Sequence, residues 1–107
     1  MMSFTLEQLD ARLGERAKAT PDQSYTAKLL ARGVEKCAQK LGEEATEAVI
    51  AGVTKNAPEL TKEAGDVLYH LLVLLRAADV PLSAVMDELE SRTGQSGLAE
   101  KAARKKD

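Results

Sequence analysis

Two acidic segments constrain the fold of this chain more than any other feature of its sequence. The first is a Glu-Glu-x-x-Glu segment and the second a Glu-x-x-Asp segment, and both lie in sequence typical of helices. Glu44 and Glu47 are spaced i, i+3, and so are Glu63 and Asp66, so each pair projects from one helix face. Like charges at this spacing destabilise a helix by about 0.2–0.5 kcal/mol, so we expect a compensating group. A divalent cation is the simplest candidate.

Residues 54–58 read Thr-Lys-Asn-Ala-Pro and predict a short break between two helices, because Asn favours turns and Pro is tolerated in a first helical turn. A short connection makes the flanking helices antiparallel neighbours, with residues equidistant from the turn at the same level. We therefore expect Glu44 to lie opposite Asp66, and Glu47 to lie opposite Glu63. Four carboxylates would converge, and an all-oxygen ligand set suits Mg²⁺ or Mn²⁺ rather than Zn²⁺.

The alternative interpretation of these acidic pairs is a solvated surface. Glu-rich helices are common, and a single pair at helical spacing would be interpreted as surface. Two pairs in mirror register across one turn favour a metal site instead.

The composition excludes several classes of protein. A chain of 107 residues with 44% apolar and 30% charged residues is typical of one globular domain. With no Trp, 3% aromatic residues and a net charge of −2, it lacks the features of a nucleic-acid binder. The single cysteine, Cys37, cannot form an internal disulfide. No signal peptide and no apolar run near the ~20 residues of a membrane span are present, so we expect a cytoplasmic protein without membrane contact.

Helical signals cover the first half of the chain. Thr5 and Gln8 fit a capping box that opens a helix running to about residue 18. A second helical stretch begins at residues 24–26 and continues to residue 53. Gly33 lies inside this stretch and would bend or split it, because Gly costs about 1 kcal/mol relative to Ala in a helix.

Two further helices are predicted, over about residues 58–79 and 81–92, the last with Val85, Met86 and Leu89 directed inward. No strand pattern is visible. We therefore expect an all-α domain over residues 1–94, a small antiparallel bundle of four to five helices. We expect residues 95–107 to be a basic C-terminal tail, separate from this domain or part of it, and either frayed or a helix that orders over a partner or ligand.

The third helix carries the run 67–75, which is apolar almost all round, and such a helix is buried on every side. A chain of this size has too few helices to enclose it, so we predict a homodimer. His70 lies in this run, four residues after Asp66. Two interpretations are open: His70 bonds a metal-bound carboxylate or a ligand, or it is a satisfied, partly buried histidine, which we favour.

A basic stripe precedes the acidic segments, with i, i+4 spacing throughout. Its members are Lys28, Arg32, Lys36 and Lys40. A charge run is usually the solvated side of a helix, and cations beside carboxylates also have a structural use. Next to a predicted metal site, the stripe indicates a surface that binds phosphate oxygens.

The acidic motifs resemble the signature of the all-α nucleoside-triphosphate pyrophosphatase superfamily, which has the MazG-like fold. Four further segments are similar to phosphoribosyl-ATP pyrophosphatases, and the resemblance extends from about residue 4 to residue 105. These segments are SYTAKLL (24–30), QKLGEE (39–44), DVLYHLLVLL (66–75) and SGLAEK (96–101). One departure is Gly65, where Ala is more usual in this family.

The resemblance implies hydrolysis of the α–β phosphoanhydride of phosphoribosyl-ATP to phosphoribosyl-AMP and pyrophosphate, the second step of histidine biosynthesis, with Mg²⁺ (or Mn²⁺ in its place). The positions that match the superfamily's metal ligands are Glu44, Glu47, Glu63 and Asp66. The candidate catalytic carboxylates are Glu43, Glu44 and Glu47, of which Glu43 would orient the attacking water or bind a second ion. By the same resemblance, Ser24, Tyr25 and Lys101 are candidate substrate contacts.

No Ser/His/Asp or Cys/His nucleophile set is visible, so we expect direct attack by water, assisted by a metal ion and a carboxylate. Two other functions are compatible with the same residues. One is a house-cleaning pyrophosphatase of the MazG-like superfamily acting on ordinary or damaged nucleotides. The other is a non-catalytic helical dimerisation module whose acidic patch is only surface.

Overall fold

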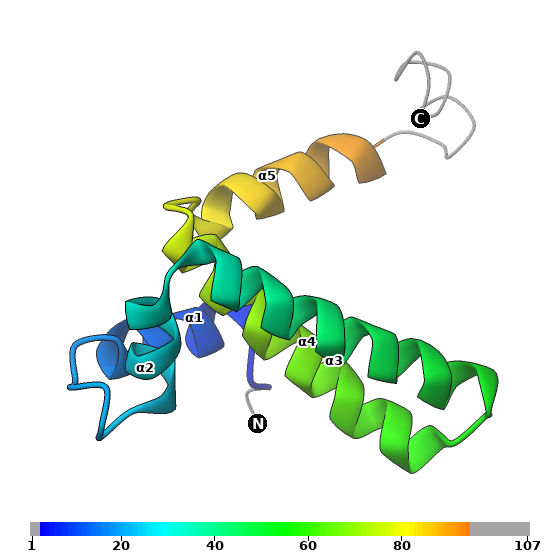
Figure 1. The fold of residues 1–107 in the computed structure, drawn as a ribbon. Coiled ribbons are helices and arrows are strands. Elements are labelled where there is room, and N and C mark those ends of the chain that lie inside the picture. Colours follow the sequence, from blue (N-terminus) through cyan, green and yellow to red (C-terminus); the bar gives the residue numbers. More distant parts are fainter. Residues whose placement is uncertain (1–2, 95–107) are drawn as a thin grey trace.

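The computed structural model describes residues 3–94, and within them the chain forms helices and no strand. The helices are α1 (Leu6–Arg16), α2 (Tyr25–Arg32), α3 (Val34–Val53), α4 (Ala57–Ala77) and α5 (Leu82–Thr93). α3 and α4 form a long antiparallel hairpin, with α1 and α2 packed at one end of it (Figure 1). The predicted all-α bundle of four to five helices is confirmed. The basic tail and Lys101 lie outside the described residues.

Side-chain caps fix three of the helix starts. The predicted capping box is present: the Thr5 hydroxyl accepts from the Gln8 backbone N–H at 3.1 Å, and the Gln8 side chain accepts from the Thr5 N–H at 2.9 Å. The Ser24 hydroxyl caps α2, and the Asn56 side chain caps α4 by accepting from the Glu59 N–H at 3.2 Å. These caps satisfy backbone donors that a helix leaves free at its N-terminus.

Gly33 splits the predicted second helix into α2 and α3. Its φ is +95° and its ψ 175°, a backbone conformation that residues with a Cβ rarely adopt. The basic stripe is divided at this point, with Lys28 and Arg32 on α2 and Lys36 and Lys40 on α3. The expectation that Gly33 would bend or split the stretch is confirmed, and the basic stripe therefore does not lie on one continuous helix.

The apolar core lies at the base of the hairpin, where α1 and α2 meet the start of α3 and the end of α4. Its buried members are Leu13, Leu29, Cys37, Leu72, Val73 and Leu82. The Cys37 thiol is 1% exposed and donates to the Leu29 carbonyl at 3.4 Å, and burial raises its pKa. The buried members come from all five of the helices described, since Leu82 is the first residue of α5, so the core joins the helices without the distal half of the hairpin.

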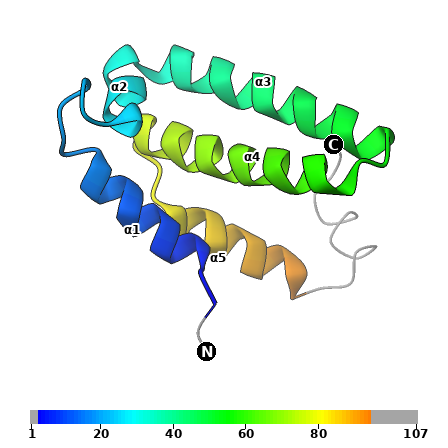
Figure 2. The ribbon, with the colours of Figure 1, turned by 90° about the horizontal axis from the view of Figure 1, so that it is seen from below.

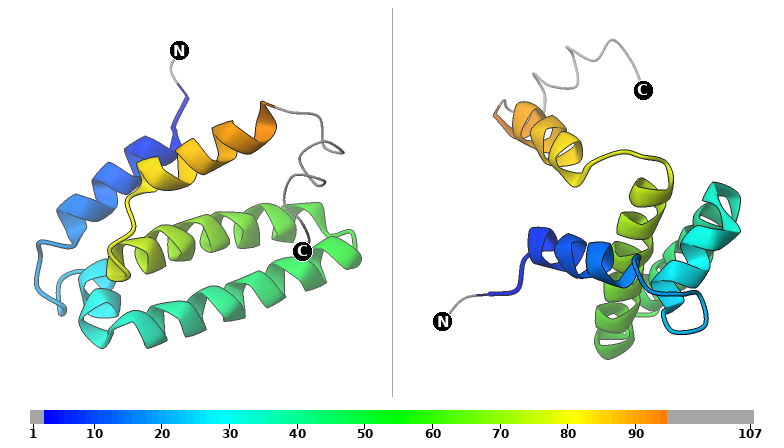
Figure 3. Two further views of the ribbon diagram at one scale, coloured as in Figure 1. Left: turned by 90° about the horizontal axis from the view of Figure 1, so that it is seen from above. Right: turned by 90° about the vertical axis from the view of Figure 1, so that its left-hand side faces the viewer.

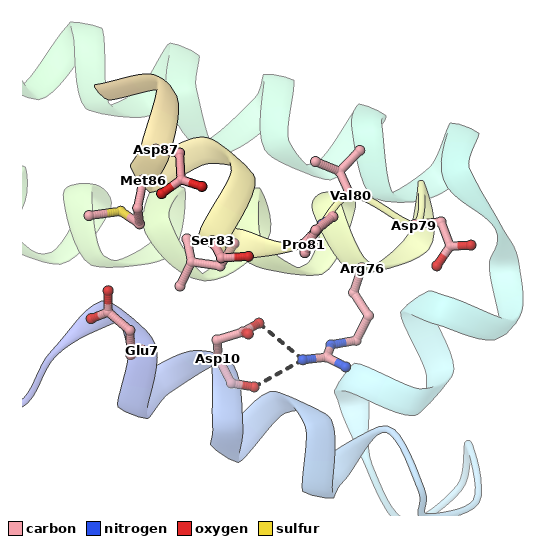
Figure 4. Close-up of a pocket in the computed structure, with 10 residues that line it drawn as sticks. Glu7, Asp10, Arg76, Asp79, Val80, Pro81, Ser83, Met86 and Asp87 are labelled. Atoms are coloured by element: carbon pink, nitrogen blue, oxygen red, sulfur yellow. Dashed lines mark hydrogen bonds and ion pairs between the residues drawn. The ribbon is translucent and has the colours of Figure 1, made fainter. Parts of the chain in front are cut away.

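A second attachment between α1 and α4 is polar. The Arg76 guanidinium bonds both the carboxylate and the backbone carbonyl of Asp10, at 3.0 and 3.1 Å (Figure 4). These groups lie in a hollow of about 690 Å³ between α1, the end of α4 and the start of α5. Glu7, Asp79 and Asp87 also line it, so this hollow is predominantly acidic.

Apolar side chains remain exposed away from the core. In the apolar run of α4, Val73 is fully buried but Leu68 is 42% exposed, so a single chain does not enclose this helix. Val49, Ile50 and Val53 on α3 are exposed as well. The radius of gyration is 16.0 Å, compared with about 13 Å for a compact domain of this length.

α5 leaves the bundle after a bend of 115° from α4, and Figure 3 shows it well separated from α3. Val85 and Met86 pack on the core as predicted, but Leu89 is 46% exposed, so its predicted inward position is wrong within one chain. Among the described residues, no helix has by itself the length and apolar character of a membrane span, and α4 and α5 meet that test only as a bent pair.

Candidate metal and substrate site

Three carboxylates converge from α3 and α4, midway along the hairpin. One oxygen each from Glu44, Glu63 and Asp66 lies within 4.8 Å of the others, and we call this group the carboxylate cluster. α3 and α4 run side by side in Figure 2, as the short turn between them requires. The predicted register, with Glu44 opposite Asp66, is confirmed.

Glu63 is the centre of the acidic contacts. It is 9% exposed, and its pKa is raised to about 7 by a hydrogen-bond contact with Glu59, by burial, and by Glu47 and Glu44. Glu47 therefore lies beside Glu63, as the mirror register predicted. This crowding of carboxylates is the repulsion between like charges for which the sequence predicted a compensating group.

Glu59 is a member of this acidic group that the sequence analysis missed. It lies one turn before Glu63 on α4, at i, i+4 spacing, so both carboxylates project from one face. Mirror pairing across the turn could not find it, because the residue opposite Glu59 is the buried Ala51. The sequence feature that could have identified Glu59 is its i, i+4 spacing from Glu63 along α4.

The donor set fits a hard divalent cation. The Glu63 Oε1 atom is buried without a hydrogen-bond partner, which is costly for a carboxylate oxygen unless a cation or a proton satisfies it. The three oxygens lie within 4.8 Å of one another, and the largest separation between ligands in an octahedral Mg²⁺ site is ~4.2 Å. All donors are carboxylate oxygens, the ligands that Mg²⁺ and Mn²⁺ prefer.

Glu43 lies outside the carboxylate cluster and contacts its own helix. It accepts from the Gln39 side chain at 2.9 Å and pairs with Lys40 at 3.3 Å, and these contacts lower its pKa. Lys36 also acts on Glu43, so the two α3 members of the basic stripe lie near the acidic group. No contact in residues 3–94 links Lys28 or Arg32 to it.

His70 is 6% exposed, and its Nδ1 atom is buried without a hydrogen-bond partner. Burial lowers its pKa and so favours the neutral ring, although the Glu44 charge opposes this shift. The favoured interpretation of His70 as a satisfied core histidine is wrong for Nδ1. This atom is a polar group available to a ligand.

A pocket of about 500 Å³ adjoins the carboxylate cluster through Asp66. We call it the α2–α4 pocket, lined by Arg16, Gln23, Ser24, Tyr25, Thr26, Asp66, Tyr69 and His70. Ser24 and Tyr25, both predicted substrate contacts, are in its wall. Arg16 was missed, because nothing near it in the sequence marks it among the other cations of the chain.

The wall of the α2–α4 pocket is fixed by polar and aromatic contacts. The hydroxyls of Thr26 and Tyr69 hydrogen-bond at 2.7 Å and so join α2 to α4. The Tyr69 ring meets His70 edge-on at 4.9 Å and lies nearly parallel to Tyr25 at 6.3 Å. An anionic ligand with one end at a cation in the carboxylate cluster could place its other end here.

Known proteins are similar to this chain over nearly its full length. Residues 6–93 match the sequence model of a family described as Phosphoribosyl-ATP pyrophosphohydrolase. The chain is 59% identical over 104 residues to the phosphoribosyl-ATP pyrophosphatase of Agrobacterium fabrum, with 97% of each chain covered. It is 60% identical to that of Rhizobium johnstonii, again over 97% of each chain. Identity to the Methylobacterium nodulans protein of the same name is 58% over 106 residues, or 99% of each chain.

Proposed function

The chain belongs to the phosphoribosyl-ATP pyrophosphohydrolase family, and we infer from this that it is a phosphoribosyl-ATP diphosphatase. It hydrolyses phosphoribosyl-ATP to phosphoribosyl-AMP and pyrophosphate, cleaving the α–β phosphoanhydride in the second step of histidine biosynthesis. The observation that carries this conclusion is 58–60% identity to relatives of that name over 97–99% of the chain.

We propose Mg²⁺ as the metal, with Mn²⁺ as a substitute. Glu44, Glu63 and Asp66 would hold it, and Glu47 would complete the set from its position beside Glu63. When bound, the ion supplies charge neutralisation for the polyphosphate and acidifies a coordinated water. The support for this assignment is the all-carboxylate donor set and the unpartnered Glu63 Oε1.

The chain's own residues supply the remaining functions. Lys36 and Lys40 lie close enough to the acidic group to act as point charges on phosphate oxygens, which is a role that Lys performs well. A carboxylate near the cluster takes the proton of the attacking water, and Glu47 is our first candidate because Glu43 is paired with Lys40. Lys28, Arg32 and Lys101 stay predicted substrate contacts.

The test of this function is turnover of phosphoribosyl-ATP and of a panel of ordinary NTPs and dNTPs, with Mg²⁺ and with chelator, followed as pyrophosphate release. We expect Mg²⁺-dependent release from phosphoribosyl-ATP alone. Release from ordinary nucleotides would move the protein to the house-cleaning branch. No release from any substrate would leave the non-catalytic module. In water labelled with heavy oxygen, direct attack places the label in a product after one turnover.

We also propose that the protein is a homodimer, as the apolar run of α4 predicted. Its support is the exposed apolar side chains Val49, Ile50, Val53 and Leu68 and the large radius of gyration. Light scattering on the purified protein should give the mass of two 11.5 kDa chains, and the mass of one chain at all concentrations would contradict it. A cytoplasmic location stays a prediction.

A further inference from the structure

Phosphoribosyl-ATP has two separate anionic ends, its triphosphate and the phosphate monoester of its second ribose. The triphosphate is cleaved, so under the proposed function it lies at the carboxylate cluster. The second phosphate needs a cationic site of its own, at a distance from the cluster. An ordinary nucleotide lacks this group, so the residues that bind it decide which substrate is chosen.

The α2–α4 pocket is placed for this role. It begins at Asp66, a member of the carboxylate cluster, and includes Arg16 and the first turn of α2. Its volume of about 500 Å³ is within the range of small-ligand pockets. A substrate with its triphosphate at the carboxylate cluster would therefore extend into the pocket past Asp66.

Several donors in this pocket have no partner. Within residues 3–94 the Arg16 guanidinium makes no ion pair, yet its charge acts on the Tyr69 phenol, so it lies close to the pocket wall. Tyr25 and Thr26 are the first residues of α2, whose N–H groups an α-helix leaves without an intrahelical acceptor. A helix N-terminus beside an arginine is a favourable environment for phosphate.

A separate observation also points to a ligand. His70 is more than nine-tenths buried and lines the pocket with an Nδ1 atom that no protein group satisfies. An unsatisfied buried polar atom is costly, and a sugar hydroxyl or phosphate oxygen would satisfy it.

We propose that the α2–α4 pocket holds the phosphoribosyl group of the substrate, with Arg16 and the first turn of α2 on its phosphate monoester. Arg16 is then a specificity-determining residue. The larger hollow beside α5 does not suit this group, because its carboxylates repel phosphate and its Arg76 is already bonded to Asp10. The inference rests on the proposed function and extends it to substrate choice.

The experiment measures binding of phosphoribosyl-AMP and of AMP to the full chain by calorimetry in Mg²⁺. The proteins compared are the wild type, Arg16→Gln, Arg16→Lys and the control Arg12→Gln. Arg12 is on the same helix, but its guanidinium lies over the Phe4 ring at 4.5 Å and does not line the pocket. Turnover of phosphoribosyl-ATP is measured on the same samples.

We expect Arg16→Gln to weaken phosphoribosyl-AMP binding by about 10- to 100-fold and to leave AMP binding within about 2-fold, because one charge-assisted contact to phosphate is lost. Arg16→Lys should lose less, and Arg12→Gln nothing. KM for phosphoribosyl-ATP should rise more than kcat falls.

Two results would overturn the assignment. Equal weakening of both ligands by Arg16→Gln would place the nucleotide, and not the phosphoribosyl group, in the pocket. No change in either ligand would remove phosphate from the pocket altogether. Failure of the proposed function looks different, because wild-type protein would then neither turn over phosphoribosyl-ATP nor prefer phosphoribosyl-AMP.

Discussion

The α3–α4 hairpin differs between its base and its middle, although the same two helices run through both. At the base, Cys37 of α3 and Leu72 and Val73 of α4 are buried with α1 and α2 in an apolar core. In the middle, the carboxylate side chain of Glu63 is buried among other carboxylates, and apolar residues of α3 are exposed nearby.

The two regions therefore differ in what stabilises them. Apolar burial at the base stabilises the chain without any ligand, by about 25 cal/mol for each Å² removed from water. The middle holds like charges together and is more favourable when a cation or a proton is present. The base therefore holds α3 and α4 in position. The middle keeps its carboxylates in an arrangement that becomes favourable when a cation or a proton binds.

The largest expected effect concerns the base. Leu72→Ala should destabilise the protein by about 2–5 kcal/mol, because Leu72 is 2% exposed and its removal leaves a cavity. Leu68→Ala, one turn earlier and 42% exposed, should cost clearly less in urea unfolding at low protein concentration. Equal costs would break the comparison by showing that Leu68 is as buried as Leu72 in solution.

The second prediction concerns the middle. Glu63→Gln should lower kcat/KM for phosphoribosyl-ATP by at least about 100-fold, because even indirect partners of metal ligands affect metal affinity by 10–100-fold. Without Mg²⁺ the same change should leave stability equal or higher, since it relieves repulsion. Glu35→Gln, in the exposed first turn of α3, is the control and should retain activity. A destabilised Glu63→Gln protein would contradict the contrast between the two regions.

Glycine replacements sharpen the comparison at a smaller scale. Gly33→Ala should destabilise by about 1–3 kcal/mol, because φ is +95° there, although the added methyl group would meet no atom within 4 Å. Gly65→Ala in the middle of α4 also meets no atom and should stabilise by up to about 1 kcal/mol. Thermal unfolding of both variants gives the signs, and matching signs would refute this account of Gly33.

The smallest effect is the pH dependence of stability without metal. The pKa of Glu63 is about 7 in the folded chain against 4.5 as its ordinary value, so the folded state binds more protons between those pH values. Its contribution to stability is present below about pH 4.5 and lost as the pH rises through 7. His70, whose pKa is lowered, contributes in the opposite direction.

Comparing wild type with Glu63→Gln cancels the His70 contribution. In chelator, the stability of wild type relative to the variant should fall between about pH 5 and 8. Parallel unfolding free energies across that range would show that Glu63 titrates normally in the folded protein.

The hairpin and its acidic pairs could be predicted because they depend on local features. Helical spacing places Glu44 and Asp66, the short turn fixes their register, and the capping box at Thr5 needs only residues 5–8. Each of these follows from the geometry of one helix or one turn. The family resemblance added the substrate, which no spacing could supply.

The remaining features depend on packing between distant segments. Arg16 enters the site only because α1 packs beside α2 and α4, and Leu89 is exposed only because α5 turns away from α4. The break of the basic stripe depends on one backbone angle at Gly33. Sequence showed that Gly33 would disturb the helix, but not the direction the chain takes afterwards.

The buried thiol of Cys37 has a consequence for the chemistry of the whole chain. It is the only cysteine in the sequence, it is 1% exposed, and burial raises its pKa, so little reactive thiolate is present at neutral pH. Thiol-directed alkylating reagents therefore have no accessible cysteine on the folded protein. A cysteine introduced on the surface would therefore be the only one to react with a thiol-directed spectroscopic label, and Cys37 would not have to be replaced first.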